Sequence, residues 1–212
     1  GHAVLQTKEL LAGEHGTIMV LCGDTPLLTA ELLARFHEEH VNAGAKATVL
    51  TAIMPNAKGY GRIVRRENGE VLKIVEHKDA TPEEREIHEV NAGIYCFDAQ
   101  ALFSALTKVT NDNAQGEYYL PDVLSILRDE GEKIWAVVAD NYESTLGINS
   151  RSQLAVAERI LRRRKVEELM ADGVTIIDPH TTFIDAEVRI GMDTVIYPFT
   201  FLEGVTVIGE DC

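Results

Sequence analysis

The sequence predicts an α/β domain, then one long helix, then a parallel β-helix. Short apolar runs alternate with amphipathic stretches over residues 1–150, which is typical of strands that are connected by helices. A single amphipathic stretch covers residues 151–172, and aliphatic residues recur at every sixth position over residues 173–212. We therefore expect three parts with these bounds: a domain, a connector helix and the first coils of a β-helix.

The first strand is expected at residues 17–22, where a continuous apolar run predicts burial on both faces. Gly23 and Asp24 end this run. The next segment has the signals of a helix, with Thr29 as its N-cap and Gly44 at its exit. The predicted apolar face of that helix consists of Leu32, Leu33, Phe36 and Val41.

The rest of the domain continues the alternation of strands and helices. The dipeptide Asn68-Gly69 favours a tight hairpin turn between two short strands. Strands are expected at residues 47–54, 63–66, 71–75, 90–97 and 134–139, and helices at about 98–108 and 120–128.

The connector is predicted as one helix over residues 152–171, ended by Gly173. Its basic block, residues 162–165, is interpreted as a solvated face that complements nearby acids. Beyond it, a β-branched residue stands two positions before each aliphatic residue of the six-residue repeat, whereas ordinary antiparallel strands would repeat every two residues. The repeated aliphatic residues, expected in the core of the coil, are Ile184, Ile190, Ile196, Leu202 and Ile208.

Composition excludes several classes of protein. The 34 acidic and 20 basic residues give a net charge of −14, which disfavours nucleic acid as a partner. The sequence has no apolar run long enough for a membrane span and no signal-peptide pattern, so we expect a cytoplasmic protein without a membrane partner. Three cysteines without CxxC spacing argue against a disulfide framework and against zinc.

Asp24 is the first candidate for chemistry. It follows the first predicted strand, at the end where open α/β sheets bind ligands. A carboxylate is a hard oxygen ligand that suits Mg²⁺, and Gly23 lets backbone approach a ligand closely. From these residues alone, a turn that leads into the next helix is an equally open interpretation.

Four further residues have a functional and a purely structural interpretation. Gly61 belongs to a GxG turn, Glu76 to a polar loop, Asn91 to the start of a strand, and Asn149 to the segment before the connector helix, which it could simply cap. We find no Ser/His/Asp or Cys/His set, no P-loop and no dinucleotide fingerprint in the sequence. This favours a reaction that depends on positioning and a metal ion rather than on a covalent intermediate.

Taken in order, these segments resemble one family. The runs LCGDTPLL, GYGRIVR, IVEHKDAT, EVNAGIY, NAQGEYYLPDV and GINSRSQL, followed by hexapeptide repeats, are similar to the bacterial bifunctional N-acetylglucosamine-1-phosphate uridylyltransferase / glucosamine-1-phosphate acetyltransferases. The resemblance implies a Rossmann-like nucleotide-diphospho-sugar transferase domain that lacks its N-terminal part. It also implies a connector helix and the start of a left-handed parallel β-helix.

The resemblance also implies a set of site residues. Asp24 and Asn149 match the two catalytic positions that bind Mg²⁺, and Asn149 would also contact the nucleotide sugar. Cys22 and Gly23 match the strand end beside the nucleotide. The positions that hold the N-acetylglucosamine moiety correspond to Gly61, Glu76 and Asn91.

The implied reaction forms UDP-N-acetylglucosamine and pyrophosphate from UTP and N-acetylglucosamine 1-phosphate with Mg²⁺. In the complete chain, a second activity would acetylate glucosamine 1-phosphate with acetyl-CoA, and the complete protein would be a homotrimer. The family's Gly-rich nucleotide loop and its acetyltransferase residues have no counterpart in this sequence. We therefore expect these 212 residues alone to be inactive.

Three alternatives stay open. One is another sugar-1-phosphate nucleotidyltransferase with an appended β-helix, of the ADP-glucose pyrophosphorylase type. A second is a non-catalytic subunit that only assembles, although the presence of both Asp24 and Asn149 speaks against it. A third, a stand-alone acyltransferase, is disfavoured because most of the chain precedes the hexapeptide repeats.

Overall fold

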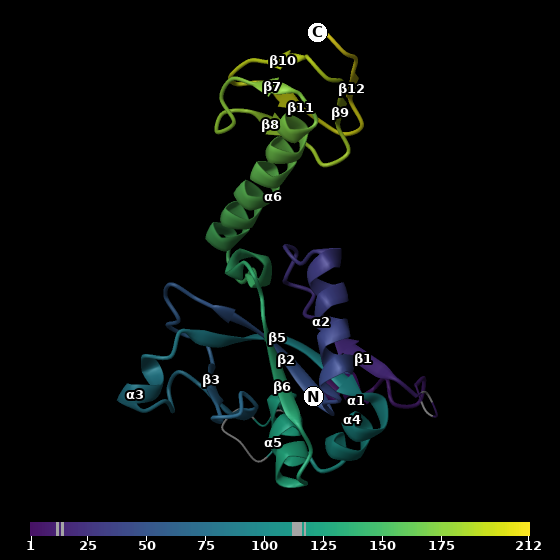
Figure 1. Cartoon of the computed structure of the whole chain (residues 1–212), viewed down its shortest axis with the longest axis vertical. Helices are drawn as coiled ribbons and strands as arrows, with labels where there is room; N and C mark the ends of the chain where they lie inside the picture. Colours follow the sequence, from purple (N-terminus) through teal and green to yellow (C-terminus); the bar gives the residue numbers. More distant parts are fainter. Residues whose placement is uncertain (12, 14, 112–115, 117) are drawn as a thin grey trace. The chain divides into compact units, whose positions relative to one another are not determined.

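The computed structural model describes residues 1–212 except 12, 14, 112–115 and 117. It divides into two compact units, Gly1–Leu146 and Gly147–Cys212 (Figure 1). This division lies just before the predicted boundary at residue 150. In the described part of the chain, no helix has the length and apolar character that crossing a bilayer would require.

One six-stranded mixed sheet forms the centre of the first unit. Its main strand order is β4-β3-β5-β2-β6, and β1 also pairs with β5. Strand β2 is parallel to β6 and antiparallel to β5, and the β3–β4 hairpin is antiparallel. The strands are β1 (Thr17–Val20), β2 (Ala47–Ile53), β3 (Arg62–Arg65), β4 (Val71–Val75), β5 (Glu89–Asp98) and β6 (Ile134–Val138). The short helices are α1 (His2–Leu5), α3 (Pro82–Arg85) and the 3₁₀ helix Tyr142–Thr145.

The prediction that the first strand is buried on both faces was wrong. Among the described residues β1 pairs with β5 alone, and all four of its residues are only half-buried. Leu21, at the end of the same apolar run, is 45% exposed. An apolar run indicates that a segment avoids water, but it does not indicate how many neighbouring strands the segment has.

Helix α2 (Ala30–Ala43) packs on one face of the sheet (Figure 1). The predicted caps are confirmed, because the Leu32 N–H donates to Thr29 Oγ1 and Gly44 ends the helix. Val41, however, is 56% exposed, and His40 takes its place in the interior. Residues four positions apart share a helix face, so Phe36 is followed there by residue 40 and not by residue 41.

The opposite face of the sheet carries the largest core of the first unit. Helices α4 (Ala99–Leu106) and α5 (Pro121–Asp129) bury their apolar sides there. Strand β5 contributes Tyr95 and Phe97 to this core, whereas Ile94 and Cys96 face α2. The alternation along β5 therefore divides its side chains between two cores.

The second unit consists of helix α6 (Arg151–Ala171) and three small parallel sheets. The sheets pair β7 with β10, β8 with β11, and β9 with β12, so strands that are three apart in the chain pair with each other. The strands are β7 (Thr175–Ile176), β8 (Phe183–Ile184), β9 (Arg189–Ile190), β10 (Val195–Ile196), β11 (Phe201–Leu202) and β12 (Val207–Ile208). We call one circuit of three strands a coil.

The aliphatic residues of the six-residue repeat gather in one cluster with Val166 and Leu169 of α6. Ile184, Ile190 and Ile196 are buried, and Leu202 and Ile208 pack against them while partly exposed. Successive coils approach closely at Gly191, where a Cβ atom would lie 2.6 Å from Gly209 C and from Glu210 N.

The basic block of α6 pairs with acids of the same helix, as expected, but it is not a uniformly solvated face, since the Arg162 and Lys165 side chains are each 14% exposed. Arg163 lies 3.7 Å from Glu167, and Lys165 lies 2.9 Å from Glu168. Arg162 lies 3.9 Å from Glu158 and also covers the Phe183 ring at 4.0 Å, and this ring stacks on Phe201 at 4.6 Å. The block therefore stabilises the helix and one outer face of the coil.

Candidate functional site

The candidate site lies along one edge of β5, where two short strands, β1 and β3, pair with different parts of β5. Val20 at the end of β1 pairs with Tyr95, and Arg62 at the start of β3 pairs with Val90. The pairing of β5 with β2 shifts at the same level, so that Leu50 faces Ile94 but Thr51 faces Asn91. Two extra residues, Ala92 and Gly93, thus form a β-bulge opposite the gap between β1 and β3.

The loop after β1 is attached to this bulge. Cys22 Sγ donates to the Gly93 carbonyl at 3.3 Å, and Gly93 has a φ of 76°, which favours glycine. Thr25 holds the loop in place, because its N–H and its hydroxyl both donate to the Cys22 carbonyl, at 3.4 and 2.7 Å. Burial and the neighbouring Asp24 carboxylate raise the pKa of the Cys22 thiol.

Asp24 itself is exposed, and among the described residues its carboxylate has no hydrogen-bond or ion-pair partner. The described residues contain no group of three or more His, Cys, Asp or Glu side chains that could form a protein-only metal cage. Mg²⁺ does not need such a cage, since it is commonly held by one or two carboxylates together with water and substrate phosphates. The exposed hard oxygen donor of Asp24 fits that kind of binding.

Gly61 and Glu76 meet at the start of β3. A Cβ atom at position 61 would lie 3.1 Å from Glu76 Oε1 and 3.1 Å from Ile74 Cγ2. The Gly61 carbonyl in turn accepts the Asn91 N–H at 2.9 Å. The absence of a side chain at Gly61 therefore leaves room for the Glu76 carboxylate, and the Gly61 backbone also holds the backbone of Asn91.

Asn91 is held through its side chain as well. Its Oδ1 accepts the Gly93 N–H at 2.9 Å, and its Nδ2 donates to the Tyr95 hydroxyl at 2.9 Å. Burial raises the pKa of Tyr95 to about 12, and Cys22 and Glu76 lie close enough to add to this shift. Asn91 therefore links Tyr95 to Gly61, Gly61 lies next to Glu76, and Cys22 attaches the loop with Gly23 and Asp24 to the same bulge.

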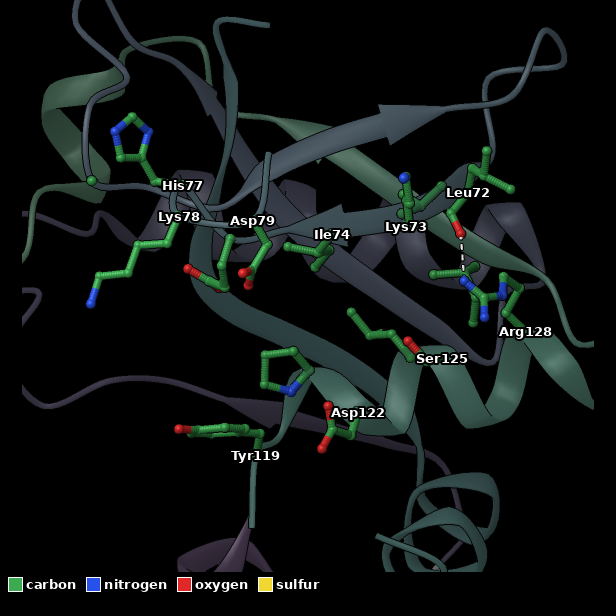
Figure 2. A pocket seen from close by; sticks show the side chains of 16 residues that line it. Leu72, Lys73, Ile74, His77, Lys78, Asp79, Tyr119, Asp122, Ser125 and Arg128 are labelled. Carbon is green, nitrogen blue, oxygen red and sulfur yellow. Dashed lines mark hydrogen bonds between the residues drawn. The ribbon is translucent and has the colours of Figure 1, made fainter. Parts of the chain in front are cut away.

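A cavity of about 760 Å³ adjoins the cluster, and Glu76 is the one predicted site residue that lines it. Figure 2 shows Tyr119, just before α5, and Asp122, in the first turn of α5, across the cavity from Lys78 and Asp79. Burial raises the pKa of the Asp122 carboxyl. The motif NAQGEYYLPDV contains both Tyr119 and Asp122, although sequence reasoning assigned no role to either; residues 113–115 and 117 of this motif lie outside the described residues.

Arg62 was also missed from the sequence. It is 2% exposed, donates to the Tyr60 carbonyl at 2.5 Å and lies 3.4 Å from His77 Nδ1. Its Nε is buried without a hydrogen-bond partner among the described residues. Its position directly after the GxG turn was the available signal, since the turn folds the chain over this side chain.

Asn149 lies in the second unit and is exposed. It does not cap α6, contrary to the structural interpretation of this residue, because the N-cap is Ser150, whose hydroxyl accepts the Gln153 N–H. The Asn149 N–H donates to Gln153 Oε1 at 2.7 Å. Helix capping therefore does not explain why an asparagine stands at this position.

Known proteins resemble this chain in sequence and in fold. The family model described as nucleotidyl transferase matches residues 1–147. The chain is 58% identical over 211 residues to "Bifunctional protein GlmU" of Geobacillus thermodenitrificans, and 56% identical over 212 residues to the protein of that name from Shouchella clausii. Each alignment covers 100% of this chain but only 46% and 47% of the relative, so the chain spans about half the length of the curated relatives it matches.

A solved structure supports the fold. UDP-glucose pyrophosphorylase complexed with UDP-glucose is similar with a TM-score of 0.56, over 77% of this chain and 62% of that one. The two sequences are 16% identical, so this likeness concerns the nucleotidyl transferase fold alone.

Proposed function

Because this chain belongs to the nucleotidyl transferase family, we propose that it is part of an enzyme that makes UDP-N-acetylglucosamine and pyrophosphate from UTP and N-acetylglucosamine 1-phosphate. The high identity to two proteins named "Bifunctional protein GlmU" supports this choice of substrates. The observation that carries the proposal is the gathering of Gly61, Glu76 and Asn91 beside the loop that exposes Asp24.

In this reaction an oxygen of the sugar phosphate forms a bond to the α-phosphorus of UTP. The bond from that phosphorus to the bridging oxygen breaks, and pyrophosphate leaves with the electron pair. No protein nucleophile is required, so the protein contributes by binding and orienting the two substrates. This agrees with the absence of a nucleophile and base motif from the sequence.

Asp24 and Asn149 would hold Mg²⁺ in this proposal, and bound Mg²⁺ would offset the negative charge that develops on the phosphates. The proposal for Asp24 is supported by its exposed carboxylate, which has no partner in the described part of the chain. That for Asn149 is supported by the resemblance and by the lack of a capping role for its side chain. Cys22 and Gly23 would line the nucleotide through their backbone.

Gly61, Glu76 and Asn91 would bind the sugar. Glu76 offers a carboxylate that accepts from hydroxyl groups, and Asn91 offers an amide N–H. Gly61 would allow the sugar and the Glu76 side chain to approach the same backbone. Because UTP is an intracellular metabolite, we also place the enzyme in the cytoplasm.

We propose in addition that the second unit is the beginning of a left-handed β-helix, which α6 connects to the nucleotidyl transferase domain. The parallel pairing at each third strand and the six-residue aliphatic cluster support this. In the complete enzyme, that β-helix would form a homotrimer and would acetylate glucosamine 1-phosphate with acetyl-CoA.

The test measures product formation by the complete enzyme with Mg²⁺. We expect UDP-N-acetylglucosamine and pyrophosphate from UTP and N-acetylglucosamine 1-phosphate, and little product when ATP and glucose 1-phosphate replace them. A preference for ATP would favour the ADP-glucose pyrophosphorylase type, and no turnover with any pair would favour a non-catalytic subunit. Acetyl transfer from acetyl-CoA and the mass of the assembly in solution test the proposals for the β-helix.

A further inference from the structure

The hydrogen bonds of Asn91 restrict what this residue can offer to a substrate. Its Oδ1 accepts two donors, the Gly93 N–H at 2.9 Å and the Tyr95 hydroxyl at 3.2 Å. An amide oxygen has two acceptor sites, so both are used within the protein. Its Nδ2 has two hydrogens, and the structure directs one of them to the Tyr95 oxygen.

The orientation of this amide is determined by its neighbours. If the carboxamide were turned by 180°, its NH₂ group would face the Gly93 N–H, and two donors would oppose each other. The Oδ1 atom therefore stays on the side of Gly93, and one N–H of Asn91 remains for a ligand. Asn91 can act on a bound sugar as a donor but not as an acceptor.

Tyr95 cannot contact the substrate itself. Its side chain is 3% exposed and stacks on Phe97, with the ring centroids 5.7 Å apart, inside the core beneath α4 and α5. Because burial raises its pKa to about 12, the hydroxyl keeps its proton at any pH at which an enzyme works. The hydroxyl is therefore a permanent partner of the Asn91 amide.

We propose that Tyr95 is a positioning residue, which fixes the Asn91 carboxamide so that its remaining N–H donates to an acceptor oxygen of the sugar 1-phosphate. The inference rests on the proposed function, since it requires that Asn91 contacts the sugar. Tyr95 then contributes to sugar affinity through one buried hydroxyl, without touching the sugar. The acceptor on the sugar is a hydroxyl oxygen or the acetamido carbonyl oxygen.

The main test is Tyr95→Phe in the complete enzyme, because this substitution removes the hydroxyl and keeps the ring. The loss of one net hydrogen bond should raise KM for N-acetylglucosamine 1-phosphate by about five- to thirty-fold. The kcat and the KM for UTP should stay unchanged, whereas a merely structural defect would change all three. Tyr142→Phe is the control, since Tyr142 packs in a separate apolar cluster and should leave each constant as it is.

Two further variants keep the test decisive if Tyr95→Phe is unstable. Asn91→Asp keeps both acceptor contacts but has no N–H to donate, so it should raise the KM for the sugar phosphate at least as much. Asn91→Ala supplies a double-mutant cycle, in which adding Tyr95→Phe should cause no further rise in KM.

An unchanged KM in Tyr95→Phe or in Asn91→Asp would overturn the inference. A rise that is equally large in the Asn91→Ala background would also overturn it, because Tyr95 would then act by another route. These results differ from a failure of the proposed function, in which the unmodified enzyme would form no UDP-N-acetylglucosamine.

Discussion

The two units of this chain use β-structure in different ways. The sheet of the first unit contains a ten-residue strand, β5, whose regular pairing is interrupted at Ala92 and Gly93, and its candidate functional residues gather at that interruption. The second unit contains two-residue strands that repeat with the same pairing, and its apolar cluster joins stacked coils to α6. Side chains beside the interruption of β5 should therefore have the largest effect on activity. Residues between coils should have the largest effect on the stability of the second unit.

The largest expected effect concerns Asp24. Activity is expected to depend on single residues beside the gap between β1 and β3. Asp24→Ala in the complete enzyme should therefore lower kcat at least about 100-fold, because a metal ligand is lost. Cys22→Ala should change kcat far less, since the proposed contact of Cys22 is through its backbone. Rates are measured by pyrophosphate release at ordinary Mg²⁺ concentrations; an Asp24→Ala enzyme with normal turnover would remove this residue from the metal site.

Gly191 tests whether contacts between coils determine the stability of the second unit. A Cβ at this position would lie 2.6 Å from backbone of the next coil, so Gly191→Ala in the 212-residue chain should lower the free energy of unfolding by about 1–3 kcal/mol. Gly209 occupies the matching position one coil later, and a Cβ there would meet no atom within 4 Å. Gly209→Ala should therefore have little effect. Equal losses in urea unfolding would contradict the view that coil contact sets the cost.

Gly61→Ala should have a smaller effect on activity. The added methyl group would press on the Glu76 carboxylate and on Ile74, each 3.1 Å away, so Glu76 must move by a few tenths of an ångström. We expect KM for N-acetylglucosamine 1-phosphate to rise about tenfold. KM for UTP and the thermal unfolding temperature should change little, and a general loss of stability would instead show that Gly61 serves folding alone.

The smallest effect concerns His40 of α2, which is buried and whose Nδ1 lies 2.8 Å from Thr48 Oγ1. Burial lowers its pKa, and His37 and Lys46 act in the same direction while Asp98 opposes them. The folded state therefore prefers neutral His40, and stability should fall as the pH drops below about 6.5, where the unfolded chain binds the proton. Urea unfolding at pH 7.5 and 5.5 measures this. His40→Gln should reduce the difference between the two values.

Local signals predicted much of the first unit. Thr29 and Gly44 correctly bracketed α2, and Asn68-Gly69 correctly predicted the β3–β4 hairpin. Val41 was assigned to the wrong helix face because apolarity was weighed above helical spacing, and the buried partner of His40, Thr48, lies on another element. The half-burial of β1 depends on its neighbours in the sheet, which an apolar run does not reveal.

The candidate site was only partly accessible to sequence reasoning. Motifs named Gly61, Glu76 and Asn91 separately, but their meeting depends on the strand register that pairs Arg62 with Val90. Tyr95 looked like one more apolar strand residue, since nothing local indicates that its hydroxyl turns back to a residue four positions earlier. The same holds for Arg62, whose burial results from the loop folded above it.

The bulge in β5 has a consequence for how this segment can change in length. Ala92 and Gly93 are an even number of extra residues, so Val90 on one side and Ile94 on the other still face the same side of the sheet as Ala52 and Leu50. Deleting one of them would turn every side chain on one half of β5 to the opposite face. Deleting both would keep the inside and outside of the strand unchanged, but it would remove the Gly93 N–H and carbonyl that hold Asn91 and Cys22. The fold of the strand, though not the candidate site, should therefore tolerate insertions and deletions in pairs at this point.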